Sequence, residues 1–186
     1  MDRLQSSFDI KQLNGDDGTF SGYGSVFGNL DSHRDIVAKG AFNDSITEAH
    51  SNGNWPAMLL QHGIGPNVED ALPVGIWTGM QEDEHGLRLE GKLAATQRGR
   101  DLYALMKMTP RPALSGLSIG YHATKFVIHG RAHTARRTLH SVNLKEVSLV
   151  SDPSNSLATV RRVKTISRST DDAYMRLMRA LQRLDA

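Results

Sequence analysis

The chain has 186 residues, a formal net charge of +2 at pH 7 and no cysteine. One domain fits this length, and disulfide frameworks, thiolate metal sites and cysteine nucleophiles are excluded. The small net charge does not predict a polyanionic partner, and no run approaches the roughly 20 apolar residues that span a bilayer. We therefore expect a soluble protein of cytoplasmic origin that binds neither a membrane nor a specific nucleic acid.

The beginning of the chain predicts a strand followed by a short helix. Glycines alternate with large apolar side chains over residues 20–28, a pattern typical of a strand or a bent hairpin. After Gly40, the apolar residues Phe42, Ile46 and Ala49 recur at helical spacing and so share one side of a helix. We expect that helix to pack on a sheet.

The middle of the chain predicts a buried strand and an antiparallel hairpin. The apolar run over residues 55–60 is short and ends just before His62, which is typical of a buried strand that ends in a loop. Apolar residues alternate with other types over 74–80 and over 87–93. A turn at residues 84–86 joins these two predicted strands.

A second helix and several strands follow. Thr96 is a suitable N-cap for an amphipathic helix, and Pro110 prevents that helix from continuing. Further strands are predicted at residues 117–121, 124–128, 137–142, 144–150 and 157–163. The pattern predicts a strand-dominated α+β fold, mainly an antiparallel β-barrel, closed or nearly closed and decorated by a few helices.

The C-terminal end predicts a linker and a separate helix. Residues 165–170 are polar, and residues 171–186 carry an apolar stripe at helical spacing. We expect a main domain over residues 1–164, a linker, and an amphipathic helix that docks on its own barrel or on a second chain. Basic residues also collect in the C-terminal half and are interpreted as a solvated face. They are Arg136, Arg137, Arg161, Arg162, Lys164 and Arg168.

Eight histidines without a cysteine raise the question of a metal site. The sequence contains no HExxH motif. His129 and His133 are four residues apart, but Gly130 lies between them in a segment with a strand pattern. Metal catalysis is therefore disfavoured, and we expect neither a metal nor a cofactor.

Ser118 is the serine whose surroundings best suit a nucleophile. On a strand, its side chain projects from the face opposite the apolar residues Leu117 and Ile119, and Gly120 leaves room for a substrate backbone. Acyl transfer by serine also needs an imidazole within hydrogen-bond reach and a group that orients it. The pattern alone is not specific, since many strands contain such a serine.

Short segments spread over most of the chain match a known family in order and spacing. They are Gly24-Ser25-Val26-Phe27, Asp31, Asp35-Ile36-Val37, Gly40-Ala41-Phe42, Leu59-Leu60-Gln61-His62, Pro73-Val74-Gly75, Gly86-Leu87-Arg88-Leu89-Glu90-Gly91, Leu117-Ser118-Ile119-Gly120-Tyr121 and Leu144-Lys145-Glu146-Val147-Ser148-Leu149-Val150, with Pro153 and Asn155. Together they resemble the prohead maturation proteases of tailed bacteriophages, whose fold is related to the assemblins of herpesviruses. The resemblance implies an assemblin-like barrel and a serine endopeptidase.

By this resemblance, Ser118 corresponds to the nucleophile and His62 to its base. Glu146 stands where the third member of the triad is expected, because a carboxylate there would orient His62. Two alternatives remain open at this position. His140 or His122 could take the third role, as a second histidine does in the herpesvirus relatives.

The donors that stabilise the oxyanion are less clear from the sequence. Assemblins follow their Ser-x-Gly with arginines, whereas Tyr121 and His122 follow Gly120 here. We expect the donor to come from Asn155 or from backbone amides of residues 152–156. The aspartates of the matched segments, Asp31 and Asp35, are expected to stabilise a turn.

The resemblance further implies partners and a place of action. The substrates would be scaffold and the N-terminal segment of the major capsid protein, cut inside an assembling prohead in the host cytoplasm. Self-cleavage within the linker 165–170 and a homodimer are further expectations. The alternative is a non-catalytic assembly protein on the same fold, in which Ser118, His62 and Glu146 are ordinary polar residues.

Overall fold

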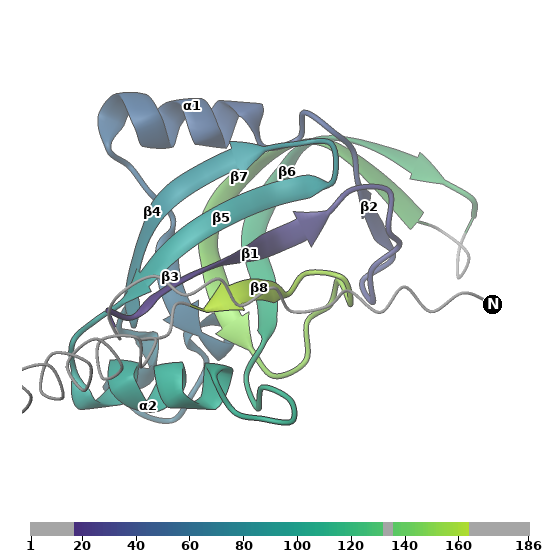
Figure 1. Cartoon of the computed structure of the whole chain (residues 1–186). Helices are drawn as coiled ribbons and strands as arrows, with labels where there is room; N and C mark the ends of the chain where they lie inside the picture. Colours follow the sequence, from purple (N-terminus) through teal and green to yellow (C-terminus); the bar gives the residue numbers. More distant parts are fainter. Residues whose placement is uncertain (1–16, 132–135, 164–186) are drawn as a thin grey trace, which may run out of the picture.

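The structure is a computed structural model that describes residues 17–131 and 136–163. Its strands are β1 (Thr19–Val26), β2 (Asp35–Val37), β3 (Ala57–Leu60), β4 (Gly75–Glu82), β5 (Gly86–Leu93), β6 (Gly116–His129), β7 (Arg136–Val150) and β8 (Val160–Val163). Its helices are α1 (Asn43–Asn52), α2 (Gln97–Met106) and the short 3₁₀ turns η1 (Gln61–Gly63) and η2 (Val68–Ala71). The strands form one curved sheet, and α1 and α2 lie on opposite sides of it in Figure 1.

Most of the predicted elements are confirmed within the described residues. The glycine-rich opening segment forms β1, the apolar run forms β3, and the alternating segments form the antiparallel pair β4 and β5. The side chain of Thr96 caps α2 by accepting a hydrogen bond from the backbone N–H of Gly99 at 3.1 Å. The strands predicted at residues 117–121 and 124–128 form the single strand β6, and those predicted at 137–142 and 144–150 form the single strand β7.

Most strand pairs are antiparallel, as predicted, but the sheet is mixed and strand pairing does not close it within the described residues, so the predicted barrel is not confirmed. The strand order is β2-β7-β3-β4-β5-β1-β8, with β6 paired to β7 outside this path. Both β2 and β3 pair with β7 in parallel, because α1 carries the chain back between them. Between the two ends of the sheet there is an isolated bridge, Gly116 to Thr159, instead of a full strand pairing within the described residues.

A core of apolar side chains fills the concave side of the sheet. Its fully buried members come from α1, from the N-cap of α1 and from strands β3, β5, β6 and β7. The core therefore joins elements that are distant in sequence. The fully buried members include Phe42, Ala49, Met58, Leu87, Leu89, Leu117, Leu139, Val147 and Leu149. Burying a side chain of this size contributes about 1.5–3 kcal/mol, so this core holds the strands that carry the candidate site.

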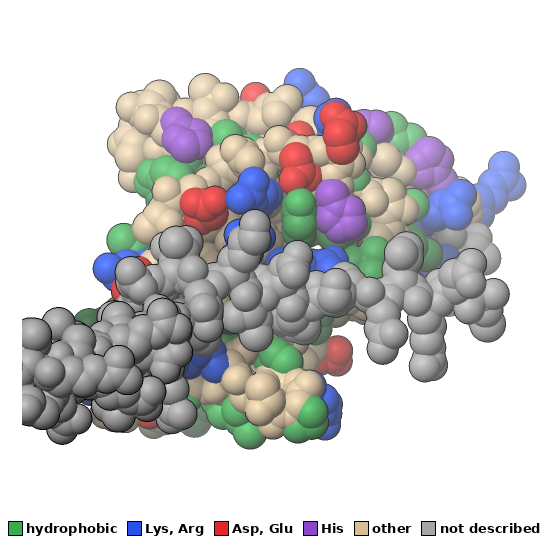
Figure 2. Space-filling view, viewed as in Figure 1, with side chains coloured by type: hydrophobic (Ala, Val, Ile, Leu, Met, Phe, Trp, Pro, Cys, Tyr) green, Lys and Arg blue, Asp and Glu red, His purple; other side chains and the backbone are tan. Residues whose placement is uncertain are grey.

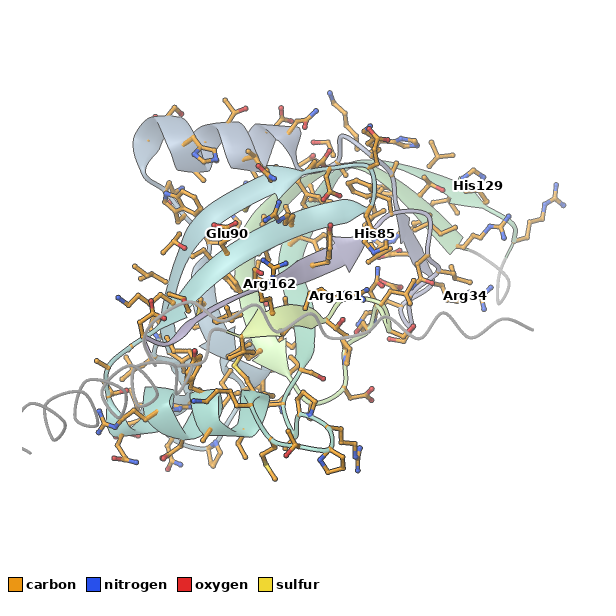
Figure 3. All side chains as sticks on the ribbon, in the orientation of Figure 1. Arg34, His85, Glu90, His129, Arg161 and Arg162 are labelled. Carbon is orange, nitrogen blue, oxygen red and sulfur yellow. The ribbon has the colours of Figure 1, made fainter. Side chains whose placement is uncertain are left out.

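The far part of the β6–β7 hairpin projects from the body of the molecule (Figure 1). Its apolar residues Phe126, Val127 and Ile128 are exposed, and His129 near the end of β6 is labelled in Figure 3. Arg161 and Arg162 lie on β8 (Figure 3). On the face shown in Figure 2, acidic and basic side chains are interspersed over the described surface.

The predicted linker 165–170 and helix 171–186 lie outside the described residues, and so does the boundary of the predicted main domain. Among the residues that the structure describes, no helix has the length and apolar content needed to cross a membrane.

Candidate active site

The pairing of β6 with β7 creates a polar face around Ser118. Ser118 lies opposite Ser148, and Gly120 lies opposite Glu146. Residues directly opposite each other in an antiparallel pair project from the same face of the sheet. The two strands therefore place one carboxylate and two hydroxyls side by side on one face.

Gly120 allows the side chain of Glu146 to cross this face. A Cβ atom at position 120 would lie 2.3 Å from Oε1 of Glu146, which is far closer than any side chain tolerates. The glycine two residues after Ser118 thus leaves the space that the carboxylate of Glu146 occupies. The sequence prediction that Gly120 leaves room for a substrate backbone missed this contact.

His62 reaches the same face through an unusual turn at the end of β3. Gln61, His62 and Gly63 all have positive φ angles, at 50°, 60° and 67°. Non-glycine residues in this region cost about 1–3 kcal/mol each, and such strain persists where the surrounding structure holds it. Here the backbone N–H of His62 donates to Oγ of Ser148 at 3.1 Å.

His62 and Glu146 form a direct contact. Nδ1 of His62 lies 2.7 Å from Oε1 of Glu146, whose side chain is 13% exposed. The other carboxylate oxygen, Oε2, accepts a hydrogen bond from the hydroxyl of Ser148. Ser148 therefore contacts both the backbone of His62 and the side chain of Glu146. Among the described residues, only Nδ1 of the His62 ring has a hydrogen-bond partner, so Nε2 can face a serine.

Ser118 and His62 line one small cleft of about 60 Å³. Ser118 is 7% exposed, whereas the side chain of His62 is 36% exposed, so the cleft opens to solvent on the histidine side. Among the described residues, the Ser118 hydroxyl makes no hydrogen bond to His62. Catalytic hydrogen bonds are often long without substrate and tighten only when it binds, so this geometry is compatible with a nucleophile and its base.

The two alternative third residues lie elsewhere. His122 on β6 and His140 on β7 are exposed, and neither lines the cleft that contains Ser118. Of the three candidates, Glu146 is the one that contacts His62. In the described part of the chain, no group of three His, Asp or Glu side chains is arranged to hold a metal ion.

The buried carboxylate of Asp35 lines the cleft and forms an ion pair with Arg137, whose side chain is 41% exposed. Asp35 on β2 is 1% exposed, and Arg137 on β7 contacts it through Nε at 2.7 Å and Nη2 at 2.5 Å. The hydroxyl of Tyr121 also donates to Asp35, at 2.7 Å. Burial by itself would raise the pKa of Asp35, but the hydrogen bonds from Arg137 and Tyr121 and the charge of Arg137 outweigh it and hold that pKa below its ordinary value.

Arg137 and Asp31 both contact Asp35. Arg137 is not simply part of a solvated face, because its guanidinium binds a buried carboxylate. Asp31 accepts a hydrogen bond from the backbone N–H of Asp35 at 2.7 Å, as expected for a turn aspartate. Burial is also the main reason why the pKa of Asp31 is raised, and burial and the Asp35 carboxylate together raise the pKa of Tyr121.

Asn155 lies in the wall of the cleft and connects three segments. Its Nδ2 donates to the backbone carbonyl of Val26 at 3.0 Å, and its Oδ1 accepts from Nδ2 of Asn29 at 3.0 Å and from the backbone N–H of Leu157 at 3.2 Å. These bonds hold the end of β1 against the loop that precedes β8. They are structural bonds, and the role of Asn155 as an oxyanion donor stays a prediction.

Sequence reasoning missed Ser148 and the partner of Asp35. Ser148 follows Glu146 by two residues, so strand alternation could have placed both on one face. Arg137 could not have been found in this way, because it lies 102 residues beyond Asp35 in the sequence.

Comparisons with known proteins show the family to which the chain belongs. A family model described as caudovirus prohead serine protease matches residues 6–173. The prohead protease of Enterobacteria phage HK97 is 32% identical over 167 residues, which cover 86% of this chain and 68% of that protein. The structure of the bacteriophage T4 capsid assembly protease is similar in fold, with a TM-score of 0.54, 11% identity, and coverage of 73% of this chain and 82% of that one.

A herpesvirus structure shows weaker similarity. The KSHV protease in complex with a hexapeptide phosphonate inhibitor has a TM-score of 0.46 and 13% identity, over 76% of this chain and 63% of that chain. The family match extends over most of the sequence, from residue 6 to residue 173. The chain therefore belongs to the caudovirus prohead serine protease family and is a serine peptidase.

Proposed function

We propose that this protein is a prohead maturation endopeptidase in which Ser118 is the nucleophile, His62 its general base and Glu146 the residue that orients His62. The observation that carries the proposal is the 2.7 Å contact between Nδ1 of His62 and Oε1 of Glu146, beside the cleft that Ser118 lines. A carboxylate in this position fixes the tautomer of the imidazole and stabilises the imidazolium that forms.

The chemistry follows from this arrangement. Nε2 of His62 takes the proton of Ser118 as Oγ bonds to the scissile carbonyl carbon, and the carbonyl π electrons move onto its oxygen. When that electron pair returns, the C–N bond breaks and the imidazolium gives its proton to the leaving amine. Water activated by the same imidazole then releases the acyl group, and the proton returns to Ser118.

The proposed substrates are the proteins of the assembling phage head. Family membership supports capsid proteins as substrates, and we propose that scaffold and the N-terminal segment of the major capsid protein are cut inside the prohead, in the host cytoplasm. Self-cleavage would fall in the polar segment 165–170, which lies outside the described residues. A homodimer and the absence of membrane and nucleic-acid partners stay predictions, as does a barrel completed through the Gly116–Thr159 bridge.

The test is co-expression of the full chain with the major capsid protein and scaffold of the same phage, followed by gel electrophoresis of the fragments. Wild type should produce discrete fragments, and Ser118→Ala should produce none. Ser141→Ala is the matched control, because Ser141 is also a buried strand serine but bonds Thr124 and Asp44 outside the cleft. Continued cutting by Ser118→Ala would reject Ser118 as the nucleophile.

The non-catalytic alternative makes the opposite prediction. A pure assembly protein would leave the capsid protein and scaffold intact in both the wild type and the variant. The family match and the relatives do not favour that alternative.

A further inference from the structure

Ser25 on β1 faces the interior because of an irregularity in the strand. Tyr23 pairs with Arg88 and Ser25 pairs with Leu87, so Gly24 is one extra residue on β1. Leu87 is fully buried, and opposite residues share a face, so the side chain of Ser25 points inward. Regular alternation would have put Ser25 on the outer face with Tyr23. Bulges often re-aim a side chain next to an active site.

The residues of β1 just before Ser25 lie against the core-facing side of the strand that carries Ser118. A Cβ atom on Gly22 would be 3.1 Å from Cδ1 of Leu117, and one on Gly24 would be 3.6 Å from Cγ2 of Ile119. The end of β1 therefore runs beside the part of β6 that contains Ser118. Ser25 lines the same cleft as Ser118 and His62.

The hydroxyl of Ser25 is buried without a partner. The residue is 1% exposed, and its Oγ makes no hydrogen bond within the described part of the chain. Buried hydroxyls without a hydrogen-bond partner are uncommon in folded proteins, so this one requires an explanation. Two other buried side-chain polar atoms among the described residues share this state, on Trp77 and Arg161, and neither residue lines the cleft.

Other polar side chains around the cleft already have bonds. The hydroxyl of Tyr121 donates to Asp35, Nδ2 of Asn155 donates to the carbonyl of Val26, and Nδ1 of His62 contacts Glu146. The imidazole of His33 bonds the hydroxyl of Ser154 at 3.0 Å. Among the described residues, the Ser25 hydroxyl is thus a buried side-chain donor of this cleft without a hydrogen-bond partner.

We propose that the Ser25 hydroxyl donates a hydrogen bond to the scissile carbonyl oxygen and stabilises the negative charge that forms there when Ser118 attacks. The proposal rests on the proposed function. The Ser25 hydroxyl then lacks a partner in the absence of substrate because it is a preorganised donor for the charge that forms only in the transition state. Asn155 contributes by holding Val26, the next residue of β1, through its bond to that carbonyl.

The test measures the rate at which a fluorophosphonate labels the full chain, because the phosphoryl oxygen of this probe takes the place of the carbonyl oxygen. Removing one such donor costs about 10²–10³ in rate, so Ser25→Ala should label that much more slowly. Its melting temperature should stay equal to that of the wild type or rise, because no hydrogen bond is lost. Ser141→Ala, which loses bonds to Thr124 and Asp44, should show the reverse: a lower melting temperature and a normal labelling rate.

Two further results separate this proposal from the assignment of the nucleophile. Mass spectrometry should find the label on Ser118 in both the wild type and Ser25→Ala, and Ser118→Ala should not be labelled. Labelling of Ser118→Ala would reject the proposed nucleophile. If Ser118→Ala is unlabelled but Ser25→Ala reacts within twofold of the wild-type rate, the role of Ser25 alone is rejected. A label on Ser25 itself would also reject that role.

Discussion

The orientation of His62 depends on which acidic or basic group holds its Nδ1. Glu146 contacts that nitrogen at 2.7 Å, whereas His122 and His140 are exposed and lie outside the cleft. In serine proteases an amide in place of the orienting carboxylate stabilises the wrong tautomer. Replacing the carboxylate by an amide therefore tests directly whether Glu146 is the third member of the triad.

We expect Glu146→Gln to lower kcat by about 10³–10⁴, because the imidazole would lose its orienting carboxylate. His122→Ala and His140→Ala should each keep activity within about twofold. The measurement is the rate of capsid-protein cleavage by the purified variants. A large loss in either histidine variant, with normal activity in Glu146→Gln, would assign the third role to that histidine instead.

Gly120 provides a second test at the scale of one residue. In Gly120→Ala the added Cβ would lie 2.3 Å from Oε1 of Glu146, so the carboxylate must move away from His62. A displacement of about 1 Å near the reacting groups can cost about 10²-fold in rate, and we expect a loss of that size in kcat.

The matched control for this variant is Gly79→Ala on β4. There the added Cβ would lie 3.2 Å from Cβ of Glu90, a contact that a shift of a few tenths of an ångström relieves, and neither residue lines the cleft. Activity of Gly79→Ala should therefore stay near that of the wild type. Equal activity of both alanine variants would show that the carboxylate position does not depend on Gly120.

At the scale of elements, an ion pair reinforces the backbone pairing of β2 with β7. Strand β2 has three residues, and its parallel pairing with β7 places Asp35 beside Arg137. Tyr121 of β6 donates to the same carboxylate, so the pair joins three strands at the wall of the cleft. Losing one partner of a buried pair leaves an uncompensated charge.

We expect Arg137→Ala to lower the free energy of unfolding by about 1–3 kcal/mol, because the buried carboxylate of Asp35 would lose two hydrogen bonds and its partly exposed cation. The neighbouring Arg136 is exposed, and Arg136→Ala should change the stability by less than about 0.5 kcal/mol. Urea unfolding at pH 7 measures both values. Similar stabilities of the two variants would mean that the pair contributes little to the fold.

At the scale of the whole molecule, this carboxylate links stability to pH. The pKa of Asp35 is lower in the folded protein than its ordinary value of 3.8. The folded state therefore favours the ionised carboxylate, and this contribution is fully present above about pH 4. It is lost as the pH falls through the folded pKa, because the proton must then be bound at the cost of the ion pair.

We expect the stability difference between the wild type and Asp35→Asn to be largest near neutral pH and to shrink as the pH falls below about 4. Asp31, whose pKa is raised mainly by burial, contributes in the opposite direction and is present in both proteins. Because the Asp35 carboxylate itself helps to raise the pKa of Asp31, the difference between the two unfolding curves reports Asp35 together with its effect on Asp31. A difference that does not vary between pH 7 and pH 3 would contradict the assigned ion pair.

The sequence by itself determined the local elements and their order. Alternation identified β1, β4 and β5, helical spacing identified α1 and α2, and Thr96 marked the start of α2. These patterns are reliable because each reports burial of one side of a local segment, which needs no knowledge of the partner. The ordered motifs also identified the family, which the match over residues 6–173 confirms.

The tertiary structure alone decided which segments meet. The parallel pairing of β2 and β3 with β7 replaced the expected antiparallel arrangement, since the direction of pairing depends on the path of the chain through α1. The choice of Glu146 over a histidine as the contact of His62, and the inward side chain of Ser25, also arise from pairing register. Register is a relation between distant segments, so no local pattern in the sequence contains it.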